Sequence, residues 1–362
     1  MRDSFPLLPP AVKGRGAVSG QPSRRFDDKG RENDGDWLDE REGIDGEGPP
    51  PPTEVTIEHP RTIITRNQSP DISFDRSINP YRGCEHGCIY CFARPTHAYQ
   101  NLSPGLDFET KLFAKPDAAA LLRKELGKPG YRCAPLAMGT NTDPYQPIEA
   151  RWRITRQILE VLAEHDHPVV FTTKSARIVR DLDLLAPMAA KGLSSVMMSV
   201  TTLDPSLARI MEPRASAPRQ RIAAIRALAD AGVPTSISVS PIVPAINDHE
   251  IEAILEAGAE AGARNAFSIA VRLPHEVSPL FREWLAVHYP DRAAKVMALV
   301  GAMRGGRDNE PDFHKRFRPQ GAYAQALHAR FKLACRKLGL NQIRFELRTD
   351  LFRVPTDQLA LF

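Results

Sequence analysis

The sequence predicts an α/β protein in which six β-α units form a partial barrel of the TIM type. After Arg61, short runs rich in β-branched residues alternate with amphipathic segments of helix length, which is the pattern of repeated β-α units around a parallel sheet. The six units occupy about 200 residues, from Asp71 to Arg272, whereas a complete eightfold barrel takes about 250. A partial (β/α)6 barrel therefore fits the chain better than a closed barrel.

The order of elements follows from the apolar periodicity and the turn residues. The strands are expected to end near Gly83, Gly139, Lys174, Val200, Ser240 and Arg272. Helices between them are expected at 117–126, 154–164, 218–231 and 248–261. Thr155 and Asp248 are the expected helix caps, and Gly232 stands where the third of these helices ends.

The segments on either side of the barrel differ in composition. Residues 1–58 are acidic, contain several glycines and the proline run 49–52, and have no apolar period, so this segment is predicted to be disordered and to contribute little to the core. Gly14 and Gly16 follow no strand and are not expected to form a phosphate loop. The barrel is assigned to 59–275. A C-terminal helical extension, 276–362, is expected to cover it with helices at 281–287, 293–302 and 322–338 and a last strand at 342–347.

Composition and charge exclude several classes of protein. The 48 basic and 44 acidic residues leave a net charge of +4, too small a difference to indicate a polyanionic partner. The apolar runs are far shorter than the ~20 residues that cross a bilayer, and no secretion signal is recognised. Three of the five cysteines crowd into eight residues, which is no disulfide framework and favours a reducing, cytoplasmic setting.

The group of three cysteines directly after the first predicted strand is the feature that indicates a chemical function. Cys84, Cys88 and Cys91 are separated by three and then two residues. Cubane iron–sulfur clusters normally take four thiolates, so a cubane held by these three would leave one iron open to a ligand. Two alternatives use the same residues: a zinc site completed by His86 or His97, and a redox pair of Cys88 and Cys91, which leaves Cys84 without a role.

The spacing, with Tyr90 before the last cysteine, resembles the signature of the radical S-adenosylmethionine (SAM) superfamily. The resemblance implies the fold of that class, a [4Fe-4S] cluster and S-adenosyl-L-methionine as cofactors, and a flavodoxin- or ferredoxin-like electron donor. In that family the open iron chelates the amino and carboxylate groups of SAM. One electron from the reduced cluster then cleaves the sulfonium to a 5′-deoxyadenosyl radical, which takes hydrogen from a substrate.

Between Ser73 and Leu340 the sequence resembles the branch of this superfamily that is related to spore photoproduct lyase. The matching pieces are Asn79-Pro-Tyr-Arg-Gly-Cys, Gly139-Thr-Asn-Thr-Asp-Pro-Tyr-Gln-Pro-Ile-Glu149, Thr173-Lys-Ser175 and Glu212-Pro-Arg214. The resemblance implies a Tyr90 near the adenine, a Lys174 and Ser199 that face the carboxylate and ribose, and polar cofactor contacts from Asn141 and Asp143. All fall near carboxyl ends of predicted strands, or in the loop after one, where barrel active sites assemble.

The chain departs from that lyase at two positions. Gly139 stands where the lyase carries a cysteine that returns hydrogen to the product radical, and Phe92 replaces a tyrosine that relays it. Cys133 lies about 20 Å before the strand end and cannot substitute. The resemblance therefore implies radical chemistry of another, unidentified type, lyase or transferase, and no catalytic residue beyond the cofactor positions is singled out.

Two further patterns are open to interpretation. Glu212 and Arg214 are expected to pair with each other and shape a loop. The basic cluster His314-Lys-Arg-Phe-Arg318, followed by Tyr323, mixes cations with aromatics as nucleic-acid surfaces do, although a solvated helix end has the same composition. Nucleic acid is thus a candidate substrate, and the oligomeric state is not predicted.

Overall fold

A computed structural model describes residues 12–23, 25, 52–343 and 345–354. Its central feature is a seven-stranded sheet with the strand order β10-β9-β8-β7-β6-β3-β2. The strands are β2 (Ile64–Arg66), β3 (Arg76–Ile78), β6 (Leu136–Met138), β7 (Val169–Thr173), β8 (Ser194–Ser199), β9 (Thr235–Ile242) and β10 (Asn265–Ala270). All are parallel except β2, which pairs antiparallel with β3.

The six parallel strands follow one another in chain order across the sheet. This sequential order is that of a β/α barrel, whereas a doubly wound sheet reverses its order part way. The end strands β10 and β2 do not pair with each other in the described part of the chain, so the sheet is open. The prediction of a mixed α/β protein with six parallel strands is confirmed.

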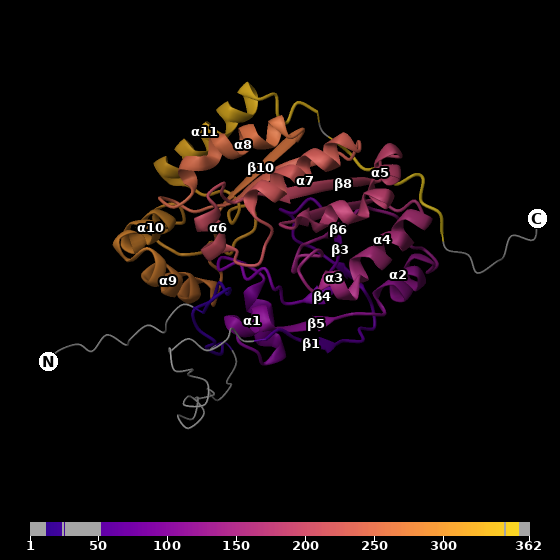
Figure 1. Cartoon of the computed structure of the whole chain (residues 1–362), viewed down its shortest axis with the longest axis horizontal. Helices are drawn as coiled ribbons and strands as arrows, with labels where there is room; N and C mark the ends of the chain where they lie inside the picture. Colours follow the sequence, from indigo (N-terminus) through magenta and orange to yellow (C-terminus); the bar gives the residue numbers. More distant parts are fainter. Residues whose placement is uncertain (1–11, 24, 26–51, 344, 355–362) are drawn as a thin grey trace, which may run out of the picture.

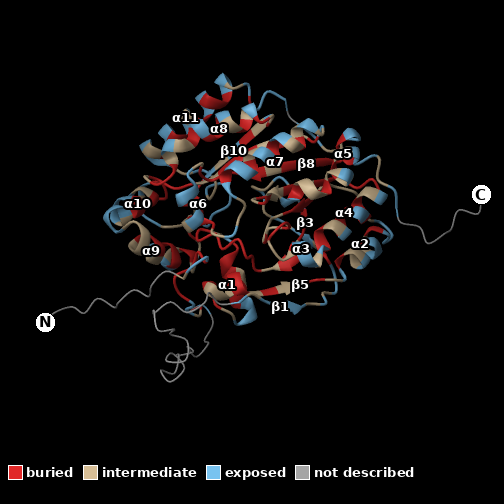
Figure 2. Ribbon diagram, viewed as in Figure 1, coloured by how far each residue is buried: buried red, intermediate tan, exposed pale blue. Residues whose placement is uncertain are grey.

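Five crossover helices cover one face of this sheet (Figure 1): α2 (Ala118–Leu126), α4 (Ile154–Glu164), α5 (Leu182–Ala190), α7 (Pro218–Asp230) and α8 (Ile251–Glu260). Alternate strand residues such as Phe171, Val196 and Ile237 are fully or almost fully buried in one cluster with helix residues. Figure 2 shows buried strands beneath helices whose outer sides are exposed. The core therefore lies between the sheet and these helices.

A second, three-stranded sheet lies beside the first, in the order β1 (Glu54–Ile57), β5 (Lys111–Ala114) and β4 (Tyr81–Arg82). The strand expected to end near Gly83 is thereby corrected, because β3 ends at Ile78 and the chain enters the other sheet as β4. Pro80, which has no N–H to donate to a ladder, stands between the two strands. The short helices η2 (Arg94–Gln100) and α1 (Leu106–Thr110) follow before β5.

Helix ends agree with the prediction in part. Gly232 adopts a left-handed φ of 77° directly after α7, as expected of a helix-terminating glycine. Thr155 is not a cap, because α4 already begins at Ile154. The Glu149 carboxylate instead accepts hydrogen bonds from backbone N–H groups in the first turn of α4, those of Thr155 at 3.1 Å and Arg156 at 3.3 Å. Asp248 is the first residue of η4 (Asp248–Glu250) rather than its cap.

The three expected C-terminal helices are present as α9 (Val277–His288), α10 (Pro290–Ala302) and α11 (Gly321–Lys337). The remaining elements are α3 (Glu149–Trp152), η3 (Ala176–Asp181) and α6 (Pro205–Met211). The last strand expected at 342–347 is wrong for its described residues, which form no strand. The chain there runs on to Arg348, whose N–H donates to the Gly192 carbonyl. No helix in the described part of the chain is long and apolar enough to cross a membrane.

Residues 12–23, here called the N-terminal strap, contradict the expectation that the first 58 residues contribute little to the core. Ala17 and Val18 are only 1% and 3% exposed. The strap also belongs to a segment with no apolar period, which is why its packing was not predicted. Residues 1–11, 24 and 26–51 lie outside the described residues, and the boundaries at 58 and 275 stay predictions.

Candidate functional site

The three cysteines lie in one loop, residues 83–93, between β4 and η2, here called the cysteine loop. Cys84 and Cys88 are buried and Cys91 is half-buried. Gly83 opens the loop with a φ of 72°, and a β-carbon there would come within 2.6–2.9 Å of Leu112, Phe108 and His97. A residue with a side chain would be strained both by its backbone and by its neighbours, so glycine fits this tight entry.

Hydrogen bonds from distant segments fix the backbone of the cysteine loop. Thr142 donates its hydroxyl to the Gly83 carbonyl at 2.6 Å. The buried Gln146 accepts the Glu85 N–H at 2.8 Å. The Ile89 N–H donates to the Met211 carbonyl at 3.1 Å. The loop is thus held by the segments after β6 and after α6 as well as by its own turns.

A buried ion pair between Arg94 and Glu109 contacts the backbone of the cysteine loop. Arg94 donates to the carbonyls of Cys88 and Gly87 at 2.9 and 3.0 Å and pairs with Glu109 at 2.5 Å. Neither side chain of the pair is exposed at all. A buried charge that loses its partner is strongly destabilising, so the pair ties the cysteine loop to α1.

The N-terminal strap closes over the same ion pair. The Glu109 carboxylate accepts the N–H groups of Gly16 and Ala17 at 2.9 and 2.8 Å. A β-carbon at Gly16 would lie 1.8 Å from the Gly87 carbonyl oxygen, so the strap backbone rests directly on the cysteine loop. Gly16 therefore serves close backbone packing, in a segment where no phosphate loop was expected.

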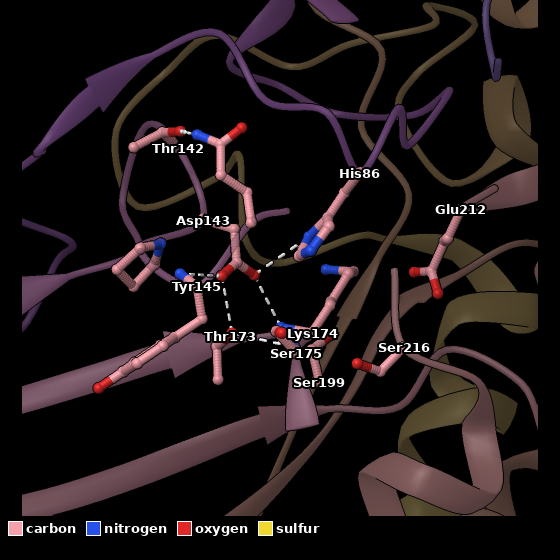
Figure 3. A network of polar contacts seen from close by, with 12 residues as sticks. His86, Thr142, Asp143, Tyr145, Thr173, Lys174, Ser175, Ser199, Glu212 and Ser216 are labelled. Atoms are coloured by element: carbon pink, nitrogen blue, oxygen red, sulfur yellow. Dashed lines mark hydrogen bonds and ion pairs between the residues drawn. The ribbon is translucent and has the colours of Figure 1, made fainter. Parts of the chain in front are cut away.

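Asp143, in the loop after β6, is the centre of one polar network (Figure 3). Its carboxylate accepts the Thr173 hydroxyl at 2.7 Å and the Lys174 N–H at 2.8 Å, and it lies 3.3 Å from the His86 ring. Burial alone would raise the pKa of Asp143, but the charge of His86 and these hydrogen bonds outweigh it and hold that pKa at about 2. The network joins the cysteine loop to the carboxyl end of β7.

Glu212 is the centre of a second network and has no exposed side-chain surface. It pairs with Arg221 at 2.5 Å and accepts hydrogen bonds from the hydroxyls of Thr201 and Tyr90. Burial opposes its charge, yet Arg221 and Lys174 prevail and hold the pKa of Glu212 at about 2. Glu212 does not pair with Arg214, which instead contacts Glu85 at 3.1 Å, so that expectation is wrong.

Lys174 and Ser199 stand at the carboxyl ends of neighbouring strands, as predicted. The Lys174 ammonium lies 5.7 Å from the centre of the Tyr90 ring, and Figure 3 shows its side chain extending beside His86. Burial would lower the pKa of Lys174, but the nearby Cys88 and Glu212 raise it. Ser199 donates to the Ser240 carbonyl at 3.1 Å, and Arg221 donates to the Ser199 carbonyl.

The structure thus joins three of the five predicted cofactor positions, Tyr90, Asp143 and Lys174, through direct contacts, and Ser199 is linked to Tyr90 through Arg221 and Glu212. The fifth, Asn141, is in the same loop as Asp143 and donates its backbone N–H to Asn79 at 3.0 Å. Three supporting side chains were not predicted: Glu109, Thr201 and Arg221. No sequence motif identifies these three residues, because they meet their partners only in the folded structure.

The other two cysteines stay away from the loop. Cys335 is buried in the main apolar cluster on α11, as expected of a packing residue. Cys133 is half-buried and precedes β6, whereas the site lies beyond the other end of that strand. Neither residue is placed to complete the set of three thiols.

The donor set suits an iron–sulfur cluster in its chemistry. Burial raises the pKa of Cys88 to about 12 and that of Cys84 well above its usual range, and thiolates are the form in which cysteines bind a metal. In the described part of the chain, no three His, Cys, Asp or Glu side chains are arranged to hold a metal ion together. The fit therefore rests on the number, spacing and burial of the thiols and on their position at the carboxyl edge of the sheet.

These features define a mixed α/β protein with a three-cysteine loop at the carboxyl edge of its parallel strands. Residues 78–258 match the family model of the radical SAM superfamily. The chain belongs to the radical SAM superfamily, whose members are enzymes that use a [4Fe-4S] cluster to cleave SAM.

Individual relatives and solved structures agree with this assignment. An uncharacterized protein of Mycobacterium tuberculosis is 36% identical over 265 residues, 73% of this chain and 76% of that protein. An uncharacterized protein of Methanocaldococcus jannaschii is 26% identical over 59% of this chain and 76% of its own length. The structure of spore photoproduct lyase complexed with dinucleoside spore photoproduct superposes with a TM-score of 0.55 at 17% identity, covering 79% of this chain and 80% of that one. At that identity the likeness shows the fold.

Proposed function

We propose that Cys84, Cys88 and Cys91 hold a [4Fe-4S] cluster and that this chain uses SAM to take hydrogen from a substrate not yet identified. The observation that carries the proposal is that Asp143 and Lys174, in the segments after two neighbouring parallel strands, contact the cysteine loop, with Ser199 at the end of the next strand. When bound, the cluster would supply the electron that cleaves SAM. A flavodoxin- or ferredoxin-like protein is the proposed electron donor.

The protein groups have separate tasks in this proposal. Lys174 would receive the carboxylate of SAM, since its ammonium has no hydrogen-bond acceptor among the described residues. Ser199 would face the ribose and Tyr90 the adenine. Asp143 holds the backbone of Lys174 and, together with Asn141, presents polar atoms on the β6 side. The parallel sheet is proposed to curve as a partial barrel around these groups.

The zinc module remains the alternative from another class, but no contact favours it. The His97 ring lies 2.8 Å from the Lys111 carbonyl through Nε2 and packs edge-on against Phe108, with ring centres 5.3 Å apart. The His86 ring is engaged by Asp143 through Nδ1. Both candidate histidine ligands already have structural partners.

Anaerobic reconstitution tests the proposal. We expect a brown protein with about four irons and four sulfides per chain that releases 5′-deoxyadenosine and methionine from SAM after reduction. The matched control is Cys88→Ala, which should bind no complete cluster and release neither product. A colourless protein with one zinc per chain would replace the proposal with the zinc module.

We also propose that this chain does not carry out the reaction of spore photoproduct lyase. Gly139 has a φ of 94°, and a β-carbon there would lie 1.9 Å from the Thr172 carbonyl oxygen. The backbone at this position therefore leaves no room for the hydrogen-donating cysteine of the lyase. Phe92 is 53% exposed and has no hydroxyl to relay hydrogen. Incubation of the reduced, cluster-loaded protein with DNA that contains the photoproduct should yield no repeated turnover to intact thymines; many turnovers would refute this proposal.

A further inference from the structure

A pocket of about 330 Å³ lies outside the networks around the cysteine loop. Residues 70–73, from the loop between β2 and β3, form one wall. His314, Phe317 and Arg318, from the segment between α10 and α11, form the other. The pocket therefore lies where segments attached to the two margins of the seven-stranded sheet meet.

Fixed contacts build this pocket. Asp71 pairs with Arg316 at 2.6 Å, and both side chains are mostly buried, at 7% and 17% exposed. Asp71 also accepts the His314 N–H at 3.0 Å, and His314 is held at a φ of 65°, a conformation that non-glycine residues rarely adopt. Sterically unfavourable backbone that persists is held by its surroundings, and it is often found at binding sites.

Positive charge at the pocket and beside it exceeds the negative charge available there: Arg318 lines the pocket, and Arg272 lies beside it, against Phe317. Asp71 is neutralised by Arg316, and Lys315 pairs with Asp312 at 3.2 Å. Arg318 and Arg272 have no ion pair or hydrogen bond from their side chains within the described residues. Arg272 is half-buried behind Phe317, with its guanidinium 4.5 Å from the ring centre. Burial, together with the charges of Arg316 and Arg304, lowers the pKa of Arg272 to about 10, which still leaves it charged at neutral pH.

The pocket is close to the edge of the sheet that carries the proposed cofactor positions. Arg272 follows the end of β10 at Ala270, and the Val271 N–H donates to the Ile242 carbonyl on β9 at 2.9 Å. The neighbouring Ser240 carbonyl accepts the hydroxyl of Ser199. A substrate anchored at Arg272 would therefore extend along the same edge as the cofactor.

We propose that this pocket binds a phosphate group of the substrate, with Arg318 in its wall and Arg272 beside it as the ligands. A guanidinium presents a planar fork that matches phosphate. The Phe317 ring is already packed against the guanidinium groups of Arg272 and Arg316, which lie 4.5 and 5.0 Å from its centre. The inference rests on the proposed function for the chemistry at the cluster, but phosphate binding itself is measurable without it.

Binding by the full-length protein tests the inference with four probes: inorganic phosphate, uridine, uridine 5′-monophosphate and a labelled single-stranded DNA ten-mer. The variants are Arg318→Gln, at an exposed position that should fold normally, and Arg272→Gln. The matched control is Arg336→Gln, which removes an exposed guanidinium in the last turn of α11 that has no ion pair among the residues described. We expect both pocket variants to weaken binding of the phosphate probes by about tenfold, and the control to leave it unchanged.

The outcomes separate the sources of the phosphate. Uridine 5′-monophosphate that competes with the ten-mer at similar affinity would indicate a nucleotide substrate, whereas tight binding of the ten-mer alone, with a salt dependence reduced in Arg318→Gln, would indicate nucleic acid. Equal binding by Arg318→Gln and wild type, or no preference for uridine 5′-monophosphate over uridine, would overturn the inference. SAM cleavage without substrate should be the same in Arg336→Gln and wild type. Wild-type protein that binds phosphate but cleaves no SAM would reject the proposed function and leave this inference standing.

Discussion

Removal of the N-terminal strap should destabilise the cysteine loop. Deleting residues 1–23 takes away two hydrogen bonds, of 2.9 and 2.8 Å, from backbone N–H groups to the buried Glu109 carboxylate. Hydrogen bonds to charged groups contribute about 1.5–3 kcal/mol each, so the loss is about 3–6 kcal/mol. For domains of 150–250 residues, 1 kcal/mol shifts Tm by about 2–4 °C, so Tm should fall by at least about 6 °C.

The matched control is a deletion of residues 1–11, which removes none of the described contacts. Thermal unfolding by circular dichroism and iron content after anaerobic reconstitution should both be lower for the longer deletion. The point variant Gly16→Ala should act in the same direction, because its β-carbon would lie 1.8 Å from a backbone oxygen of the cysteine loop. If the longer deletion kept the Tm and iron content of the control, the strap would not support the loop and the reasoning would be wrong.

Three more predictions concern the site. Alanine at any one of the three loop cysteines should abolish the cluster, whereas alanine at Cys133 or Cys335 should retain it, as judged by iron content and visible absorbance. Glu212→Gln leaves Arg221 buried without its counter-charge and should cost about 3–5 kcal/mol of unfolding free energy, measured in urea. Folding lowers the pKa of Glu212 from 4.5 to about 2, so the contribution of its carboxylate to stability is present above pH 4.5 and is lost as pH falls toward 2. In Glu212→Gln the unfolding free energy should therefore fall less steeply with decreasing pH. An equally steep fall in the variant would contradict this prediction. Gly139→Cys should lower Tm and confer no lyase activity, because the side chain meets the Thr172 backbone; a stable, active variant would show that the backbone can move.

The sequence predicted the parallel sheet well because buried strands leave a strong pattern. The last five strands end at Met138, Thr173, Ser199, Ile242 and Ala270, each within two residues of the predicted position. Their apolar runs are bounded by glycine, lysine or serine, which mark the carboxyl edge. The three-stranded sheet was missed because β4 has only two residues and β5 has four, too few for a period to be recognised.

The candidate site was predictable where its residues form a short motif or directly follow a strand. The cysteine spacing identified the loop, and the strand ends identified Lys174 and Ser199. Glu109 could not be found in this way, because its partner Gly16 lies 93 residues earlier and the two meet only through tertiary packing. The strap was misjudged for a related reason: it binds through backbone N–H groups, which every sequence carries, rather than through an apolar face.

The charges around the cysteine loop bear on the proposed role of Lys174. Glu212 is buried and the Asp143 side chain is only 10% exposed, and each already has a partner from another segment, Arg221 and His86. Their negative charge is therefore largely compensated within the protein, and the Lys174 ammonium, beside the Tyr90 ring, has no acceptor of its own among the described residues. The Asp143 carboxylate fixes the backbone of Lys174 before any ligand arrives. A carboxylate that enters this space would meet a cation whose backbone is already fixed. Binding would then lose little conformational entropy at Lys174, and a preorganised ion pair contributes more to affinity than one that must first be ordered.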